Sequence, residues 1–297
     1  MTPLVSVVMS TYNRADILSE AVDSILNQTF DDFEFIIIND NSTDDTHEKL
    51  IRYKDSRIRL FNNKKNCGCT FNYHNAQNLA CGKYVAHIDD DDISLPERFE
   101  KQVDFMESNL DIDLAGTFIE TFGEQGKVRP SWVFYTEPET LDFMMNFYNP
   151  ICHSSVMYRK SFVDKCGINY DITKKCAQDY DFYKQIIINN GKLANLSEVL
   201  VKYRMHSNRL TDINESQQIQ IMNAEKIKYE LLSRYLSKKQ IENQNMLLEG
   251  FPFNSYKKEN VITAVEILGS VINSENNEFQ RVIEKVKTDI ENDLFTF

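Results

Sequence analysis

Residues 84–92 read YVAHIDDDD, an apolar run that is followed at once by four consecutive aspartates. The run predicts a buried strand, and Pro96-Glu97-Arg98 shortly afterwards predicts the start of a helix. Four adjacent carboxyl groups at the end of a buried strand repel one another, so some stay protonated or they hold a cation. Oxygen ligands suit Mg²⁺ or Mn²⁺, which keep coordination positions open for substrate phosphates. The alternative is a solvated acidic turn that only caps the next helix, but the flanking strand and helix favour the cation site.

Strand and helix patterns alternate through the first part of the chain. Strands are predicted at 4–9, 33–38, 58–61 and 84–88, and helices at 15–27, 43–53 and 70–80. This alternation is typical of an α/β fold with a Rossmann-like, mostly parallel sheet and flanking helices. In such folds the loops at the carboxyl ends of the strands build the ligand site.

The rest of the chain changes character twice. Strands are expected near 112–118, 154–158 and 199–204, with helices near 138–147 and 178–189; helical patterns then run through 219–235, 238–249, 259–272 and 279–294. We therefore predict three units, residues 1–110, residues 111–212 and a C-terminal helical region at 213–297.

Composition and charge exclude several classes of protein. The 297 residues are 42% apolar and carry a formal net charge of −12. Nonspecific nucleic-acid binding needs clustered Lys and Arg, so no nucleic-acid partner is expected. No stretch approaches the ~20 apolar residues of a membrane-spanning helix. We expect a cytoplasmic protein, with peripheral contact at the inner face of the membrane left open.

Polar side chains also follow the first two predicted strands. Thr11, Tyr12, Asn13 and Arg14 end the first, and residues 39–44 (NDNSTD) end the second. Each segment has a purely structural alternative, because Asn turns the chain easily and Ser or Thr caps helices. Three polar strand ends beside one another in a parallel sheet nevertheless favour a common binding rim.

These motifs, in this order, resemble those of glycosyltransferase family 2, whose members have the two-part GT-A fold. The matching segments are VSVVMSTYN at 5–13, SILNQTF at 24–30, EFIIINDNSTD at 34–44, GKYVAHIDDDD at 82–92, PER at 96–98, QDYD at 178–181 and YRMH at 203–206. The resemblance covers roughly residues 4 to 210, and the number of ordered motifs makes it specific.

The resemblance implies an enzyme that moves a sugar from a nucleoside-diphosphate donor, with UDP favoured, to a hydroxyl of a saccharide or lipid-linked glycan. The reaction inverts the anomeric centre, depends on Mn²⁺ or Mg²⁺, and belongs to polysaccharide biosynthesis at the bacterial surface. Residues 1–110 become the nucleotide-sugar-binding half and 111–212 the acceptor-binding half. The helices of 213–297 are assigned to acceptor binding, docking or assembly of a homo-oligomer.

The resemblance also gives roles to individual residues. Asp91 and His206 are the predicted metal ligands, and Asp179 is the predicted catalytic base, although an Asp in the first turn of a helix is also favoured by the helix dipole alone. His153 and Gln178 are placed on the acceptor side. The predicted donor-binding residues are Thr11, Tyr12, Asn13, Arg14, Asp40, Asn66, Asp89, Asp90, Asp92 and Arg204. Among them, Asp40 is expected to accept a hydrogen bond from the nucleobase.

The sequence departs from the family pattern at three places. Gln178 replaces a Glu beside the predicted catalytic base, Asn39 stands where many relatives have Asp, and Tyr73-His74 replaces a common Arg-Asn pair. These differences bear on acceptor handling and nucleotide contacts and leave the type of reaction unchanged.

Three rival functions are less well supported. A phosphotransfer enzyme with an Asp-x-Asp nucleophile usually carries it on the first strand, whereas here the aspartates end the fourth. A sugar nucleotidyltransferase has a Gly-rich loop after the first strand, and residues 10–14 contain no glycine. A non-catalytic scaffold of the same fold would not need Asp91 and Asp179.

Overall fold

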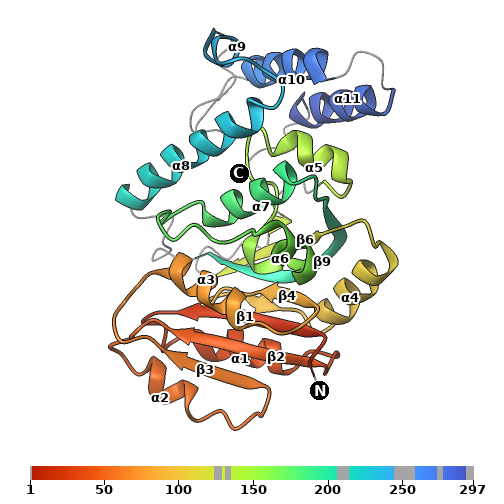
Figure 1. The fold of residues 1–297 in the computed structure, drawn as a ribbon. Helices are drawn as coiled ribbons and strands as arrows, with labels where there is room; N and C mark the ends of the chain where they lie inside the picture. The colour runs from red at the N-terminus through yellow and green to blue at the C-terminus, as the bar shows by residue number, and fades with distance from the viewer. Residues whose placement is uncertain are drawn as a thin grey trace.

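The computed structural model describes residues 2–123, 129–130, 135–205, 214–243, 258–272 and 277–291. Within these ranges the chain forms one mixed β-sheet flanked by helices, and the last helices stack beyond it (Figure 1). The strand order is β3-β2-β1-β4-β8-β6-β9-β5, with β7 paired to β6.

The first part of the chain provides the elements β1 (Val5–Thr11), α1 (Leu18–Leu26), β2 (Phe33–Asn39), α2 (Thr46–Leu50), β3 (Ile58–Asn62), α3 (Cys69–Leu79), β4 (Tyr84–His87), β5 (Ile93–Ser94) and α4 (Arg98–Ser108). The second part provides β6 (Leu114–Gly123), β7 (Arg129–Pro130), α5 (Pro138–Met144), the 3₁₀ turn η1 (His153–Ser155), β8 (Met157–Arg159), α6 (Lys160–Cys166), α7 (Gln178–Ile188) and β9 (Leu193–Met205). The C-terminal helices are α8 (Asn214–Leu232), α9 (Lys238–Asn243), α10 (Lys258–Ile272) and α11 (Asn277–Glu291).

Four neighbouring strands, β3, β2, β1 and β4, run parallel. In the register of this sheet, Val5 of β1 lies opposite Phe33 of β2 and Tyr84 of β4. Because parallel strands end at the same edge, the segments that follow β1, β2 and β4 meet there. The sequence-based prediction of a common rim therefore holds in the backbone.

The second half of the sheet is mixed. Strand β8 pairs antiparallel with both β4 and β6, whereas β6 pairs parallel with β9. The predicted boundary at 110/111 falls between α4 and β6, but the ladder β4-β8-β6 carries the sheet across it without a break. The two predicted halves thus share a single sheet.

Strand β9 is longer than the predicted segment 199–204. It begins at Leu193, and its pairing with β6 jumps from Leu196 to Val199, so that Ser197 and Glu198 bulge out of the ladder. The bulge interrupts the regular alternation of side chains, which is why the pattern revealed only the later part of the strand.

Alternate side chains of β1 face two different apolar layers. Val5, Val7 and Met9 pack with α1 and α4 in one layer, whereas Val8 packs with α3 in the other. The buried positions of α1 show the expected helical spacing and are Leu18, Ala21, Val22 and Ile25. The second layer is the larger one, because it continues through α7 into the C-terminal helices.

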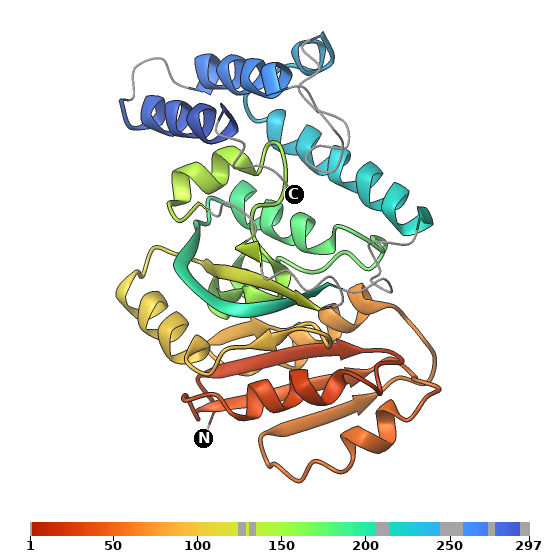
Figure 2. The ribbon, with the colours of Figure 1, turned by 180° about the vertical axis from the view of Figure 1, so that it is seen from behind.

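The C-terminal helices pack onto the rest of the chain. Ile227 and Leu231 of α8 lie in the same apolar cluster as Phe182 and Ile186 of α7, and α10 and α11 lie together above α5 (Figure 2). This confirms the predicted helical region, while its role in self-association stays a prediction. No helix in the described ranges is long and apolar enough to cross a membrane.

Gly82, in the connection between α3 and β4, provides a test of how closely β1 and β4 pack. A Cβ at this position would lie 2.7 Å from the Ser6 nitrogen, 2.9 Å from the Val5 carbonyl carbon and 2.9 Å from the Tyr84 oxygen. All three are backbone atoms of paired strands, so they cannot move aside cheaply. We expect Gly82→Ala to lower the free energy of unfolding by about 1–3 kcal/mol, measured by denaturant titration. An unchanged midpoint would contradict this packing.

Candidate active site

The four aspartates that follow β4, Asp89, Asp90, Asp91 and Asp92, form a cluster that we call the acidic tip. Arg14, in the loop after β1, reaches across the rim to it. Its Nε lies 3.4 Å from Asp90 Oδ1, and its Nη2 lies 3.8 Å from Asp91 Oδ2. One guanidinium group thus serves two adjacent carboxyl groups of the tip.

Asp89 is held by the residues that surround it. Its Oδ1 accepts a 2.6 Å hydrogen bond from the Tyr73 hydroxyl and lies 3.1 Å from His153 Nδ1. Its backbone N–H donates to Ser154 Oγ at 3.2 Å. Burial opposes ionisation of Asp89, but the charge and hydrogen bond of His153 outweigh it, so the pKa of Asp89 is lowered. Asp89 in turn raises the pKa of His153 against the effect of burial.

Asp90 and Asp92 have the opposite environment. Burial and the neighbouring charge of Asp91 raise the pKa of Asp90 to about 7, and the same two causes raise the pKa of Asp92 well above its ordinary value. The Arg204 N–H donates to Asp92 Oδ1 at 2.8 Å, whereas Asp92 Oδ2 is buried and has no hydrogen-bond partner among the described residues. The tip therefore combines an ionised carboxylate with carboxyl groups that favour their protons.

Arg204 is built into this arrangement. Its Nε donates to the Asp91 carbonyl at 2.8 Å, and its Nη2 lies 3.0 Å from Glu20 Oε2. The guanidinium group also stacks over the Phe122 ring at 4.4 Å. Strand β9 is thereby fixed to the acidic tip.

The acidic tip fits a divalent metal that is shared with a substrate. Within the described ranges, no three His, Cys, Asp or Glu side chains converge on one metal position. Mg²⁺ is commonly bound by one or two carboxylates together with substrate phosphates, which is the donor set that Asp91 and its neighbours offer. Asp92 Oδ2 is buried without a hydrogen-bond partner among the described residues, and burial together with the charge of Asp91 raises the pKa of Asp90, so a bound cation would stabilise the ionised form of both groups. The other predicted ligand, His206, lies outside the described residues.

The loops after β1 and β2 are joined at Asn13. Its Oδ1 accepts the Thr43 N–H at 2.8 Å, and its own N–H donates to Ser42 Oγ at 3.0 Å. Asn13 has φ 54°, a left-handed conformation that Asn tolerates better than most residues. Asn13 therefore has the turn-forming role that its residue type suggested, and its hydrogen bonds hold the two loops of the rim together. Thr11 lies buried beneath this rim, and Tyr12 is 43% exposed on it.

Asp40 holds the loop that leads into α3. Its carboxylate accepts hydrogen bonds from Asn63 Nδ2 at 2.6 Å, the Cys67 N–H at 2.9 Å and the Gly68 N–H at 2.8 Å. Its backbone N–H donates to the Thr11 carbonyl, which keeps the ends of β1 and β2 together. Asn66 is exposed at the outer side of this loop.

Asp179 lies in the first turn of α7, and Gln178 is the first residue of that helix. Asn149 Nδ2 donates a 2.8 Å hydrogen bond to Asp179 Oδ2. Burial raises the pKa of Asp179, and the nearby His153 partly opposes the shift. A carboxylate with a raised pKa is better suited to accept a proton near neutral pH.

One short segment, residues 149–154, supports both carboxylate groups. Asn149 binds Asp179, while His153 and Ser154 bind Asp89. The family resemblance places His153 on the acceptor side and gives no role to Asn149 or Ser154. The only local signal was the polar content of NPICHSS at 149–155, within an otherwise apolar stretch.

A buried chain of aromatic residues extends behind His153. Its Nε2 lies 3.2 Å from the Tyr170 hydroxyl, which lies 3.2 Å from His87 Nε2. Burial and the charge of His153 lower the pKa of His87, so His87 is neutral. The sequence marks Tyr73 only as a departure from the family pattern and does not mark Tyr170, because the partners of both residues come from distant segments.

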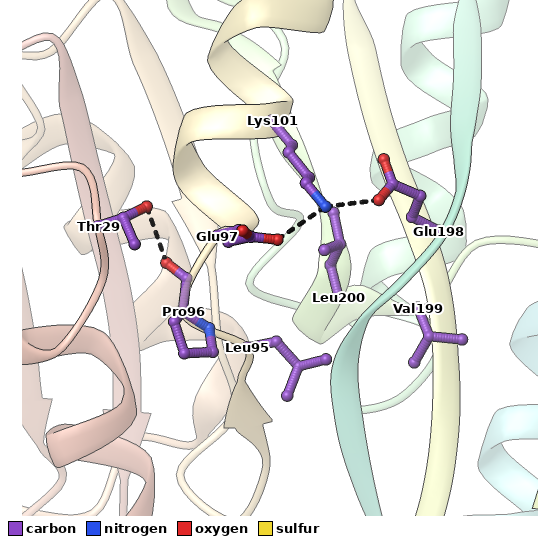
Figure 3. Close-up of a pocket in the computed structure, with 8 residues that line it drawn as sticks. All are labelled: Thr29, Leu95, Pro96, Glu97, Lys101, Glu198, Val199 and Leu200. Atoms are coloured by element: carbon purple, nitrogen blue, oxygen red, sulfur yellow. Dashed lines mark hydrogen bonds and ion pairs between the residues drawn. The ribbon is translucent and has the colours of Figure 1, made fainter.

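A surface pocket of about 520 Å³ lies outside this site (Figure 3). It is lined by Thr29, Leu95, Pro96, Glu97, Lys101, Glu198, Val199 and Leu200. Lys101 Nζ lies 2.8 Å from Glu97 and 2.6 Å from Glu198, so two carboxylates of this pocket share one ammonium group. It contains no residue of the predicted donor or acceptor site.

Comparison with known proteins identifies the family. A family model described as glycosyl transferase family 2 matches residues 6–167, more than half of the chain. The chain belongs to glycosyltransferase family 2. It is therefore a nucleotide-sugar-dependent glycosyltransferase, which confirms the predicted class of enzyme.

Relatives in sequence span most of this glycosyltransferase. An uncharacterized glycosyltransferase of Methanocaldococcus jannaschii is 38% identical over 211 residues, which cover 68% of this chain and 71% of the relative. The Escherichia coli protein WfaP, named UDP-Glc:alpha-D-GlcNAc-diphosphoundecaprenol beta-1,3-glucosyltransferase, is 30% identical over 208 residues, which cover 69% of this chain and 78% of WfaP.

Solved structures share the fold. Staphylococcus aureus TarS 1–349 in complex with UDP-GlcNAc superposes with a TM-score of 0.60 at 19% identity, over 99% of this chain and 90% of TarS. The mannosyltransferase PcManGT of Pyrobaculum calidifontis, in complex with GDP-Man and Mn²⁺, gives a TM-score of 0.63 at 12% identity, over 99% and 82% of the two chains. At these identities the likeness concerns the fold alone, and it confirms the predicted GT-A fold.

The protonation of Asp90 predicts how stability depends on pH. A carboxyl group whose pKa is about 7 in the folded state and ordinary in the unfolded state makes stability fall as the pH rises from about 4 to 7. Asp90→Asn removes this loss. With chelator present, we expect the variant to gain on the order of 2 kcal/mol over wild type at pH 8 and much less at pH 5, measured by urea unfolding. An equal difference at both pH values would contradict the raised pKa.

Proposed function

We propose that this glycosyltransferase moves a sugar from a UDP-linked donor to a hydroxyl group of a saccharide or lipid-linked glycan, with inversion and with help from a divalent metal. The observation that carries the proposal is the shared support of two carboxylates, Asp89 and Asp179, by the segment 149–154. One carboxylate belongs to the charged donor rim and the other has the environment of a base.

In the proposed reaction, Asp179 removes the proton from the acceptor hydroxyl as its oxygen attacks the anomeric carbon. The bond between that carbon and the diphosphate oxygen breaks on the opposite face, and the electron pair leaves with the nucleoside diphosphate. The raised pKa of Asp179 and its hydrogen bond from Asn149 support this role, since a general base must be both basic and oriented.

On the donor side, we assign Asp91 to the metal and Asp89 to the ribose. A bound Mn²⁺ or Mg²⁺ would supply the positive charge that a departing diphosphate needs. Arg14 is close enough to the acidic tip to share this task. Asp40 is assigned to the nucleobase of the donor. Its carboxylate already accepts hydrogen bonds from the N–H groups of Cys67 and Gly68, so the nucleobase would share this carboxylate with them.

Relatives support the choice of substrates. The printed name of WfaP specifies a UDP-glucose donor and a diphosphoundecaprenol-linked acceptor, and TarS was solved with UDP-GlcNAc. We therefore propose a UDP-sugar donor, a lipid-linked saccharide acceptor and a place in polysaccharide assembly at the inner face of the membrane.

A screen of nucleotide sugars tests the reaction class. We expect Mn²⁺-dependent release of nucleoside diphosphate from one or a few UDP-sugars, abolished by chelator. If no donor releases nucleoside diphosphate and no nucleotide binds in a metal-dependent way, the non-catalytic scaffold is favoured instead.

Asp179→Asn tests the base. The amide keeps the size of the side chain but cannot accept the proton, so we expect transfer to fall by at least about 100-fold. The dissociation constant for UDP should not change, as measured by calorimetry. Asp164→Asn, at an exposed carboxylate on α6, is the matched control. Full activity of Asp179→Asn would refute the assignment.

Asp91→Ala tests the metal site. Loss of the ligand should abolish the dependence of UDP binding on Mn²⁺ and leave only weak, metal-independent binding. Asp32→Ala removes an exposed carboxylate just before β2 and should bind like wild type. Wild-type metal dependence in Asp91→Ala would place the metal elsewhere.

A further inference from the structure

We propose that α8, in the C-terminal region, positions the catalytic base, and that Asn223 is the residue through which it acts. The inference rests on the proposed role of Asp179. It gives the first helix of the C-terminal region a part in the transfer reaction.

The turn before α7 has a conformation that its own sequence does not favour. Ala177 has φ 57° and ψ 28°, in the left-handed region, where a residue with a Cβ pays about 1 kcal/mol or more. Ala has no polar side chain with which to cap the helix. Contacts from outside the turn must therefore hold it, and Asp179 lies only two residues further on.

Asn223 supplies such a contact. Its Nδ2 donates a 2.9 Å hydrogen bond to the carbonyl of Cys176, the residue that precedes Ala177. Cys176 is buried, so without Asn223 its carbonyl would lose a partner in a place that is poor in water. The hydrogen bond thus fixes the peptide that sets the direction of the first turn of α7.

A second contact ties α8 to the same helix. Lys184 of α7 lies 2.8 Å from the buried Asp181 and also pairs with Glu230 of α8. Asp181 further pairs with Lys174, in the loop before the turn. The first turn of α7 is therefore held by charges on both sides.

The contact residues of α8 share one face. Asn223, Ile227, Glu230 and Leu231 follow the i, i+4, i+7, i+8 spacing of a helix stripe. Ile227 and Leu231, on the same face as the two polar contacts, are fully buried. Helix α8 accordingly lies along α7, as Figure 1 shows.

These contacts lie beyond the part of the chain that the family model covers, which ends at residue 167. The strand-end motifs build the donor rim, whereas the geometry of the base depends on a helix that comes some 40 residues later in the chain than Asp179. A change in α8 can therefore alter transfer without touching the donor.

The test compares Asn223→Leu and Asn223→Asp with Met222→Ala, at the adjacent residue that is 57% exposed on the same helix. Both Asn223 variants lose the donor amide, and only one adds charge, so agreement between them excludes a charge effect. We expect kcat for transfer to fall about 10-fold in both, because a base displaced slightly from its position loses much of its effect. The donor KM and the UDP dissociation constant should stay at wild-type values, as should all constants of Met222→Ala.

A double mutant separates positioning from stability. In an Asp179→Asn background, Asn223→Leu should cause no further loss of kcat, since the base that it positions is already absent. A wild-type kcat in Asn223→Leu would overturn the inference. So would a parallel loss of UDP binding and of thermal stability, which indicates a purely structural role. Full activity of Asp179→Asn would instead overturn the proposed function itself.

Discussion

The whole site depends on keeping four neighbouring carboxyl groups together at the end of one buried strand. Electrostatic repulsion would drive such a cluster apart, and the protein resolves it by giving each group a different environment. Asp89 is paired with His153 and stays ionised, whereas Asp90 and Asp92 are buried where a proton is favoured. Arg14 spans Asp90 and Asp91 from the neighbouring loop. The four groups are thus kept together at some cost to the stability of the fold, as functional sites often are.

The features that the sequence predicted well are those with a local signature. The apolar runs of β1, β2 and β4 and the polar residues at their ends are contiguous in the chain, and parallel topology alone brings them together. The family motifs then pointed to Asp179 as a candidate base. These segments can be recognised from the sequence alone, without knowledge of side-chain contacts.

The features that the sequence did not predict depend on contacts between distant segments. Asn149 meets Asp179 across 30 residues, and Tyr73 and Tyr170 reach the same histidine-containing cluster from different helices and loops. A single Asn or Tyr has no periodicity and is common in folded proteins, so no local pattern distinguishes these residues. The antiparallel insertion of β8 escaped prediction for a similar reason: three residues are too few to reveal the direction in which a strand runs.

Because β8 hydrogen-bonds to β4 on one side and to β6 on the other, the two predicted halves of the chain, 1–110 and 111–212, belong to one continuous sheet. Many two-part enzymes exclude water by swinging two lobes together about a hinge. Here such a motion would break the backbone hydrogen bonds that join β8 to β4 and β6 in the middle of the sheet. In the proposed reaction, any shielding of the sugar from water must therefore come from segments that lie outside the sheet.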